Sequence, residues 1–131
     1  MPAILVVEDS PAMRAFVRAS LEPIESCDVA LAENGFEALR VLPRRRYDLI
    51  VTDINMPDIN GLELIRFVRQ SESHRDVPIV IISTDASPRD RERAIALGAT
   101  DYLVKPFSAD DLRAVVEKRL LGARAGLEGL P

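Results

Sequence analysis

Four apolar runs, each followed by charged or hydroxyl residues, constrain the fold of this chain more than any other feature. They are AILVV before Glu8-Asp9, DLIVT before Asp53, PIVII before Ser83 and DYLV before Lys105. Runs of Val, Ile and Leu with little polar alternation are typical of strands covered on both faces, as in a parallel sheet. The carboxyl ends of parallel strands share one edge, where ligands bind, so these polar residues are expected to form a site.

Strands and helices are predicted to alternate along the chain. The expected strands are 3–8, 27–32, 48–52, 78–83 and 101–104, and the expected helices are 11–21, 35–42, 61–70, 88–97 and 109–121. This alternation predicts an α/β fold: a single doubly wound (βα)5 domain with a five-stranded parallel sheet and helices on both faces. The residues leave the strand order open. The order 2-1-3-4-5 would place Glu8-Asp9 beside Asp53.

Each predicted helix carries a start signal. Ser10 and Ser87 stand before prolines, which suits a hydroxyl at the N-cap and proline at the first helical position. An N-cap side chain followed by an acid three residues later occurs at Asn34, Asn60 and Ser108. Gly98 is well placed to end the fourth helix.

The length of 131 residues indicates one domain, expected at residues 1–121, followed by a Gly-rich flexible tail at 122–131. A net charge of −4 argues against direct nucleic-acid binding. No apolar run approaches the about 20 residues of a membrane span, and no secretory signal is visible. We therefore expect a cytoplasmic protein without membrane insertion, either stand-alone, which we favour, or the N-terminal part of a longer chain.

Two residue types occur once each. Cys27 excludes an internal disulfide and is expected to be a small core residue. His74 lies in the polar stretch SESHRD and is expected on a surface loop.

The residues at the strand ends predict phosphoryl chemistry. Glu8, Asp9 and Asp53 would repel one another without a hard cation such as Mg²⁺, or Mn²⁺ in its place. Lys105 suits a phosphate oxygen, and Ser83 can donate a hydrogen bond to one. Taken singly, each has an ordinary explanation as a cap, turn or strand-end residue. Together they match an aspartyl-phosphate mechanism in which Asp53 attacks phosphorus.

The ordered set of motifs resembles the receiver domains of two-component response regulators, particularly single-domain chemotaxis regulators. The matching segments are Glu8-Asp9, TDINMPDINGLELI from Thr52 to Ile65, Ser83-Thr84, and YLVKPF from Tyr102 to Phe107. The resemblance covers residues 3–121 and implies the strand order 2-1-3-4-5 of that family.

The resemblance also implies roles at the site. Asp53 would be the phosphoacceptor, and Lys105 would pair with the phosphoryl group, with a cis bond to Pro106. Mg²⁺ would be bound by Asp9, by Asp53 and by the backbone carbonyl of Asn55. Glu8 would assist through a water molecule.

Further positions would control switching. Ser83 and Tyr102 match the hydroxyl and aromatic switch residues, and Tyr102 would turn inward on activation. Asn55 and Asp85 match positions that tune dephosphorylation, and Asp85 could orient a water and shorten the life of the phosphoryl group. The face built from the fourth helix, fifth strand and fifth helix would then change and control a partner.

The implied partners are a sensor histidine kinase or a histidine phosphotransfer protein, and a downstream protein target. The chain would be a monomer or a weak phosphorylation-dependent dimer. It would not be an enzyme, and would catalyse only its own phosphorylation and dephosphorylation. Two other interpretations stay open. One is a receiver-like module that acts without phosphorylation. The other is an aspartyl-phosphate phosphatase, disfavoured because Asn55 replaces the second acid of its D-x-D motif and the chain is short.

Overall fold

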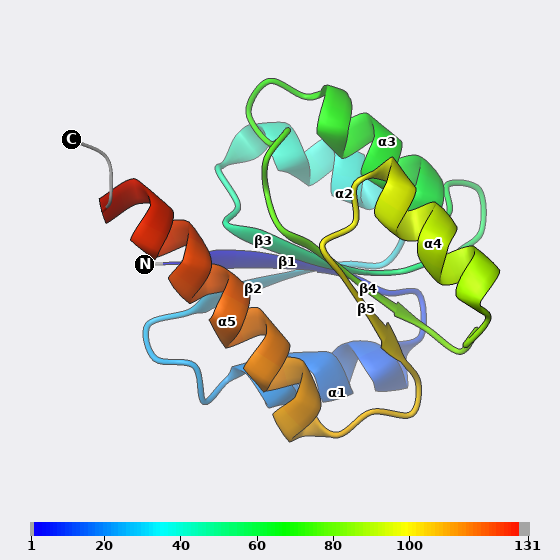
Figure 1. Ribbon diagram of the computed structural model, residues 1–131, viewed down its shortest axis with the longest axis horizontal. Helices are drawn as coiled ribbons and strands as arrows, with labels where there is room; N and C mark the ends of the chain where they lie inside the picture. The colour runs from blue at the N-terminus through cyan, green and yellow to red at the C-terminus, as the bar shows by residue number, and fades with distance from the viewer. Residues whose placement is uncertain (1, 129–131) are drawn as a thin grey trace.

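The five predicted strands form one parallel sheet in a computed structural model that describes residues 2–128 (Figure 1). The strands are β1 (Ala3–Val7), β2 (Asp28–Ala32), β3 (Leu49–Asp53), β4 (Ile79–Ser83) and β5 (Asp101–Val104). Their spatial order is β2-β1-β3-β4-β5, and every neighbouring pair is parallel. This order confirms the one implied by the resemblance and makes β1 and β3 neighbours.

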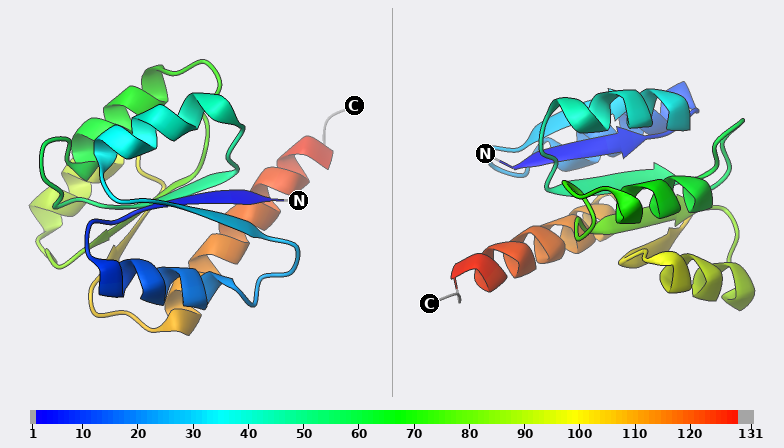
Figure 2. Two further views of the ribbon diagram at one scale, coloured as in Figure 1. Left: turned by 180° about the vertical axis from the view of Figure 1, so that it is seen from behind. Right: turned by 90° about the horizontal axis from the view of Figure 1, so that it is seen from above.

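Helices cover both faces of the sheet, as predicted. They are α1 (Pro11–Leu21), α2 (Gly35–Val41), α3 (Gly61–Gln70), α4 (Pro88–Leu97) and α5 (Ala109–Glu128), with a short 3-10 turn at Leu42–Arg44. Figures 1 and 2 show α2, α3 and α4 on one face and α1 and α5 on the other.

Two apolar clusters explain why the strand sequences lack polar alternation. Leu5, Ile50 and Ile81 pack into the cluster that includes residues of α2, α3 and α4. Their neighbours Ile4 and Val51 pack into the opposite cluster with residues of α1 and α5. Successive side chains point to opposite faces of a strand, so a sheet covered twice requires apolar residues at consecutive positions.

The helix start signals all form hydrogen-bonded caps. The side chains of Ser10, Asn34, Asn60 and Ser87 each accept a backbone N–H three residues later. Ser108 does the same before α5 by accepting the Asp111 N–H at 3.0 Å. These contacts are local in sequence, so they could be predicted from spacing alone.

Apart from the end of α5, the ends of the elements differ from the prediction by at most one residue, and two of these differences are informative. The second helix ends at Val41 because Pro43 has no N–H to donate and shifts the chain into the 3-10 turn. Asp53, predicted just beyond its strand, is the last residue of β3, where it still pairs with Ile82 of β4.

The end of the last helix is a larger correction. We predicted an end at residue 121, but α5 continues to Glu128. Gly122 and Gly126 each weaken a helix by about 1 kcal/mol relative to alanine, but the Ala, Arg and Leu residues around them favour one, and the helix continues. The division into a domain at 1–121 and a tail at 122–131 stays a prediction, and residues 129–131 lie outside the described residues.

His74 was predicted on the surface, but only 3% of it is exposed. Its Nε2 accepts the backbone N–H of Tyr47 at 3.0 Å, and its Nδ1 lies 2.9 Å from the Ser73 hydroxyl. The polar neighbours in SESHRD concealed this burial, because the contact to Tyr47 spans 27 residues. Cys27 is partly buried against the core, as expected.

Within residues 2–128, no helix combines the length and the apolar character needed to cross a membrane.

Candidate functional site

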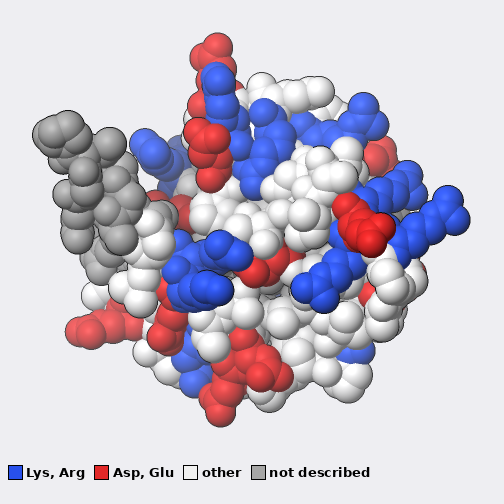
Figure 3. Space-filling model, in the orientation of Figure 1, with Lys and Arg blue, Asp and Glu red and all other residues white. Residues whose placement is uncertain are grey.

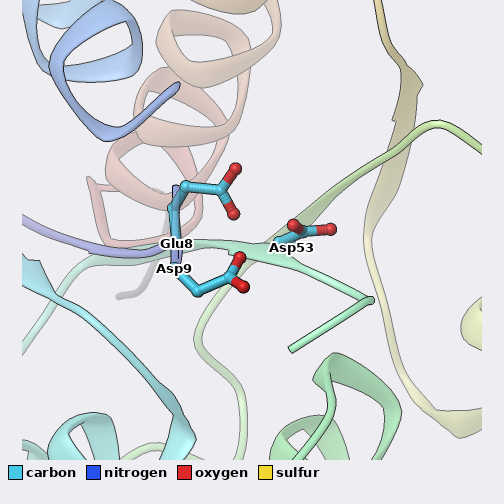
Figure 4. A group of neighbouring side chains, drawn as sticks. All are labelled: Glu8, Asp9 and Asp53. Carbon is cyan, nitrogen blue, oxygen red and sulfur yellow. The ribbon is translucent and has the colours of Figure 1, made fainter. Parts of the chain in front are cut away.

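Three carboxylates converge at the carboxyl edge of the sheet. Figure 4 shows Glu8 and Asp9 on the segment after β1, and Asp53 at the end of the neighbouring strand β3. Each of the three offers an oxygen within 4.8 Å of the oxygens of the others. Glu8 is fully buried and Asp53 is 6% exposed, whereas Asp9 faces solvent. The strand order produces this arrangement by placing β1 next to β3.

Lys105 supplies a positive charge to this group. Its Nζ lies 3.0 Å from Glu8 Oε1 and 3.3 Å from Asp53 Oδ2. Burial alone would lower the pKa of Lys105, but the hydrogen bond to Glu8 and the charge of Asp53 outweigh it and raise that pKa. Lys105 is therefore a firmly charged ammonium, and the bond from Lys105 to Pro106 is cis, as the resemblance implied.

The Glu8 carboxyl is disfavoured as a charged group despite its contact with Lys105. Burial, followed by the neighbouring Asp53 carboxyl, raises the pKa of Glu8 to about 7, although Lys105 acts in the opposite direction. Glu8 Oε2 is the only buried side-chain polar atom in the described part of the chain without a hydrogen-bond partner. A buried oxygen without a partner and an excess of carboxylates fit a hard divalent cation such as Mg²⁺.

The segment after β3 contacts Asp53 through its backbone. The Asn55 N–H donates to Asp53 Oδ1 at 3.1 Å, while the Asn55 side chain is on the exposed surface. Gly61 allows this segment to fold back, because a Cβ there would clash with the Asp53 carbonyl oxygen. Asp53 is thus held between a backbone amide on one oxygen and Lys105 on the other.

Ser83 at the end of β4 and Tyr102 on β5 both contact Asp85 in the loop after β4. The buried Ser83 hydroxyl accepts the Asp85 N–H at 3.0 Å, and the Tyr102 hydroxyl donates to the Asp85 carbonyl at 2.8 Å. Tyr102 is 8% exposed, so its side chain is already largely buried in this structure. The structure therefore joins the predicted switch residues through the backbone of one loop residue.

One residue near the site was missed in the sequence analysis. Arg14, on α1, donates from its guanidinium to the backbone carbonyls of Glu8 at 2.8 Å and Asp9 at 3.5 Å. The cap at Ser10 could have revealed it, because position 14 then lies one turn into the helix, above the end of β1.

Exposed basic side chains gather on α4. Arg89, Arg91 and Arg93 are exposed on α4, and a shallow groove along this helix includes the 44%-exposed Ile95. Figure 3 shows Lys and Arg side chains gathered on the part of this face where α4 lies. The face comprises α4, β5 and α5, which adjoin in Figure 1.

Comparisons with known proteins agree with this geometry. A family model described as the response regulator receiver domain matches residues 4–117. A chemotaxis protein CheY homolog of Campylobacter jejuni is 36% identical over 124 residues, which are 94% of this chain and 95% of that protein.

Two solved structures are similar in fold and sequence. The chemotaxis response regulator CheY4 of Vibrio cholerae has a TM-score of 0.84 and 34% identity, covering 91% of this chain and 98% of that one. The receiver domain of the sensor histidine kinase PA1611 of Pseudomonas aeruginosa has a TM-score of 0.82 and 34% identity, covering 91% and 97%. That receiver domain was solved with a magnesium ion coordinated in its active-site cleft.

The site, the strand order and the comparisons agree with one another. The acidic group stands at the switch point of a 2-1-3-4-5 sheet, with a lysine and a hydroxyl at the same edge. The family match spans most of the chain. This protein belongs to the response regulator receiver domain family of two-component signalling and resembles CheY.

Proposed function

We propose that this protein is a phosphorylation-activated signalling switch with Asp53 as the phosphoacceptor. The observation that carries the proposal is the position of the Asp53 carboxylate, nearly buried between the Glu8–Asp9 pair and the Lys105 ammonium at 3.3 Å. An acid in this position has a neighbouring cation for the charge of an incoming phosphoryl group, and the same loop edge provides the Ser83 hydroxyl.

The reaction is phosphoryl transfer from a phosphohistidine. An oxygen of Asp53 forms a bond to phosphorus, and the bond from phosphorus to the imidazole nitrogen of the donor breaks. The imidazole leaves with the electron pair of that bond. The Asn55 amide and Lys105 orient Asp53 through separate oxygens, and Lys105 offsets the negative charge on the phosphoryl oxygens.

Glu8, Asp9 and Asp53 would hold Mg²⁺, with the backbone carbonyl of Asn55 as a further ligand and Glu8 acting through a water. When bound, the ion neutralises charge on the transferring group. The excess of carboxylates and the unpartnered Glu8 Oε2 support this assignment. Mn²⁺ accepts a similar set of oxygen ligands and would substitute for it.

The signal would leave the site through the loop after β4. A phosphoryl group on Asp53 gives the Ser83 hydroxyl a strong acceptor to donate to, and movement of the Ser83 side chain toward it would draw the hydroxyl oxygen away from the Asp85 N–H that it now accepts. Movement of Asp85 would change the hydrogen bond from Tyr102. The α4–β5–α5 face would then rearrange. Asn55 and Asp85 would set the lifetime of the phosphoryl group.

The partners are proposed by role. A sensor histidine kinase or a histidine phosphotransfer protein would donate the phosphoryl group. A downstream protein would read the α4–β5–α5 face, where the exposed arginines of α4 and the adjoining Ile95 offer charge and apolar contact.

The test is intact mass after incubation with Mg²⁺ and acetyl phosphate or phosphoramidate. Wild-type protein is expected to gain one labile phosphate, and the Asp53→Asn variant none. Circular dichroism confirms that both proteins are folded, and Mg²⁺ binding is measured on the wild type. If folded, Mg²⁺-bound wild type gains no phosphate from either small donor or from a histidine kinase, the proposal is wrong and a phosphorylation-independent module becomes the better interpretation.

A further inference from the structure

Arg14 holds the backbone of the acid pair without pairing with its carboxylates. The guanidinium donates to the Glu8 carbonyl at 2.8 Å and the Asp9 carbonyl at 3.5 Å, and lies 3.9 Å from Glu33 of the β2–α2 connection. Its side chain is only 16% exposed. In the described residues, no ion pair joins Arg14 to Glu8, Asp9 or Asp53, so its charge does not serve to balance the site directly.

These contacts fix the direction in which Asp9 points. Peptide groups are planar, so holding a carbonyl oxygen fixes the plane of its whole peptide unit. The two carbonyls that Arg14 binds belong to the peptide units before and after the Asp9 Cα. Holding both planes sets the backbone angles of Asp9 and therefore the orientation of its Cα–Cβ bond.

Arg14 is itself firmly placed. Its backbone N–H donates to the Ser10 carbonyl at 2.9 Å in the first turn of α1, and Ser10 caps that helix. Both hydrogen bonds come from one guanidinium nitrogen, Nη1, whose two N–H donors are held in the plane of the group. Asp9 needs such support because, unlike Glu8 and Asp53, it is exposed to solvent.

We propose that Arg14 is a positioning residue for the metal site, which orients Asp9 through the backbone of the β1–α1 loop. This inference rests on the proposed function, because it assumes that the acidic group binds Mg²⁺. Groups that orient metal ligands from outside the ligand set commonly change metal affinity by about 10- to 100-fold.

Charge and positioning predict effects of opposite sign. If Arg14 acted only through its positive charge, its removal would strengthen Mg²⁺ binding, because like charges repel. If it acts by positioning, its removal weakens Mg²⁺ binding despite that relief. The Arg14→Met variant separates the two, and Arg18→Met is the matched control, since Arg18 is an exposed arginine one turn further along α1.

The experiment is a Mg²⁺ titration of full-length protein by calorimetry or by amide chemical shifts, since the chain has no tryptophan to report binding. Arg14→Met is expected to raise the Kd for Mg²⁺ about tenfold, and Arg18→Met to leave it unchanged. Phosphorylation by acetyl phosphate should then need more Mg²⁺ for half its maximal rate, while the rate at saturating Mg²⁺ is retained. A purely structural defect would not produce this split.

Arg14→Lys provides the second variant. It keeps the charge but has a single ammonium in place of the planar fork, so its Kd should lie between wild type and Arg14→Met. It decides the question if Arg14→Met does not fold. The inference is wrong if Arg14→Met binds Mg²⁺ with a Kd equal to or below that of wild type. If Arg14→Met does not fold, the same criterion applies to Arg14→Lys. Wild type that binds no Mg²⁺ contradicts the metal assignment of the proposed function itself.

Discussion

The carboxyl and amino ends of the sheet differ in whether their polar groups have hydrogen-bond partners. At the carboxyl end, Glu8 and Asp53 lie close together, and Glu8 Oε2 has no partner. At the amino end, both ring nitrogens of His74 have partners, and Asp48 accepts the Ala3 N–H at 2.7 Å. Arg69 completes this end by donating to the carbonyls of Val77 at 2.7 Å and Gly98 at 2.6 Å.

The difference separates stability from function. Buried polar groups that are fully paired stabilise a fold, whereas unpaired ones cost free energy. At the amino end, long-range hydrogen bonds join the starts of the strands. The stability that they contribute offsets the free-energy cost of the charge cluster at the carboxyl end. A site that binds ligands keeps unsatisfied groups for the ligand to complete. Changes at the amino end should therefore alter stability, and changes at the carboxyl end should alter the response to Mg²⁺ and pH.

The largest effect on stability is expected at Arg69. Arg69→Ala removes the donor that joins α3 to the carbonyls before β4 and β5, and should lower the free energy of unfolding by about 3 kcal/mol. Urea unfolding measures this loss. Arg66→Ala, an exposed change on the same helix, is the control and should have little effect. An equal loss in both variants would contradict the role given to the amino end.

Glu8 should make the carboxyl end less stable as pH rises. Its pKa is about 7 in the folded state against an ordinary 4.5, so the folded protein keeps a proton that the unfolded chain has lost between these values. Its contribution is complete below the ordinary value and lost as pH rises through about 7, on the order of 2 kcal/mol. Urea unfolding without divalent cations, at about pH 5 and about pH 8, measures the loss.

Glu8→Gln is the matched variant. It cannot ionise, so it should be more stable than wild type at the higher pH and lack this part of the pH dependence, while binding Mg²⁺ more weakly. Added Mg²⁺ should stabilise wild type most at the higher pH, because it favours the ionised carboxylate. A wild-type pH profile identical to that of Glu8→Gln would show that the pKa of Glu8 is not raised in the folded protein.

His74 should give a smaller effect with the opposite sign. Burial, and then the charge of Arg46, lower its pKa below 6.5, so its contribution is complete above 6.5 and decreases as pH falls below that value. His74→Leu leaves the Tyr47 N–H without its acceptor and should cost about 1.5 kcal/mol. His74→Gln keeps an acceptor without a titrating group, and should flatten the acid side of the unfolding profile. An acid side as steep as that of wild type would contradict this assignment.

Local patterns allowed much of the fold to be predicted. The apolar strand runs, the caps at Ser10 and Asn60, and the turn at Gly98 depend on neighbours within a few residues, so spacing reveals them. The convergence of Glu8, Asp9 and Asp53 could be expected for a related reason. Each follows or ends a strand, and parallel strands end at a common edge.

The misplaced end of α5 has a local cause of another kind. Glycine both weakens and ends helices, and the stretch after residue 121 contains it twice before Glu128. Helix propensity therefore could not decide whether α5 ends or continues after residue 121. His74 shows the opposite limit, because its polar neighbours suggested a loop on the surface, whereas a distant backbone amide required an acceptor inside.

By itself, the sequence determined which residues stand at strand ends, which cap helices and which chemistry they can perform. Only the tertiary structure decided that Lys105 pairs with Glu8, 97 residues away, and that Tyr102 bonds to the Asp85 carbonyl. The same holds for the contacts of Arg14: the cap at Ser10 places its side chain near the end of β1, but the backbone carbonyls that it binds are present in every residue and are marked by no sequence pattern. The physical reason is that periodicity and capping act within a turn or a strand, whereas these contacts exist only after packing brings distant backbone and side chains together.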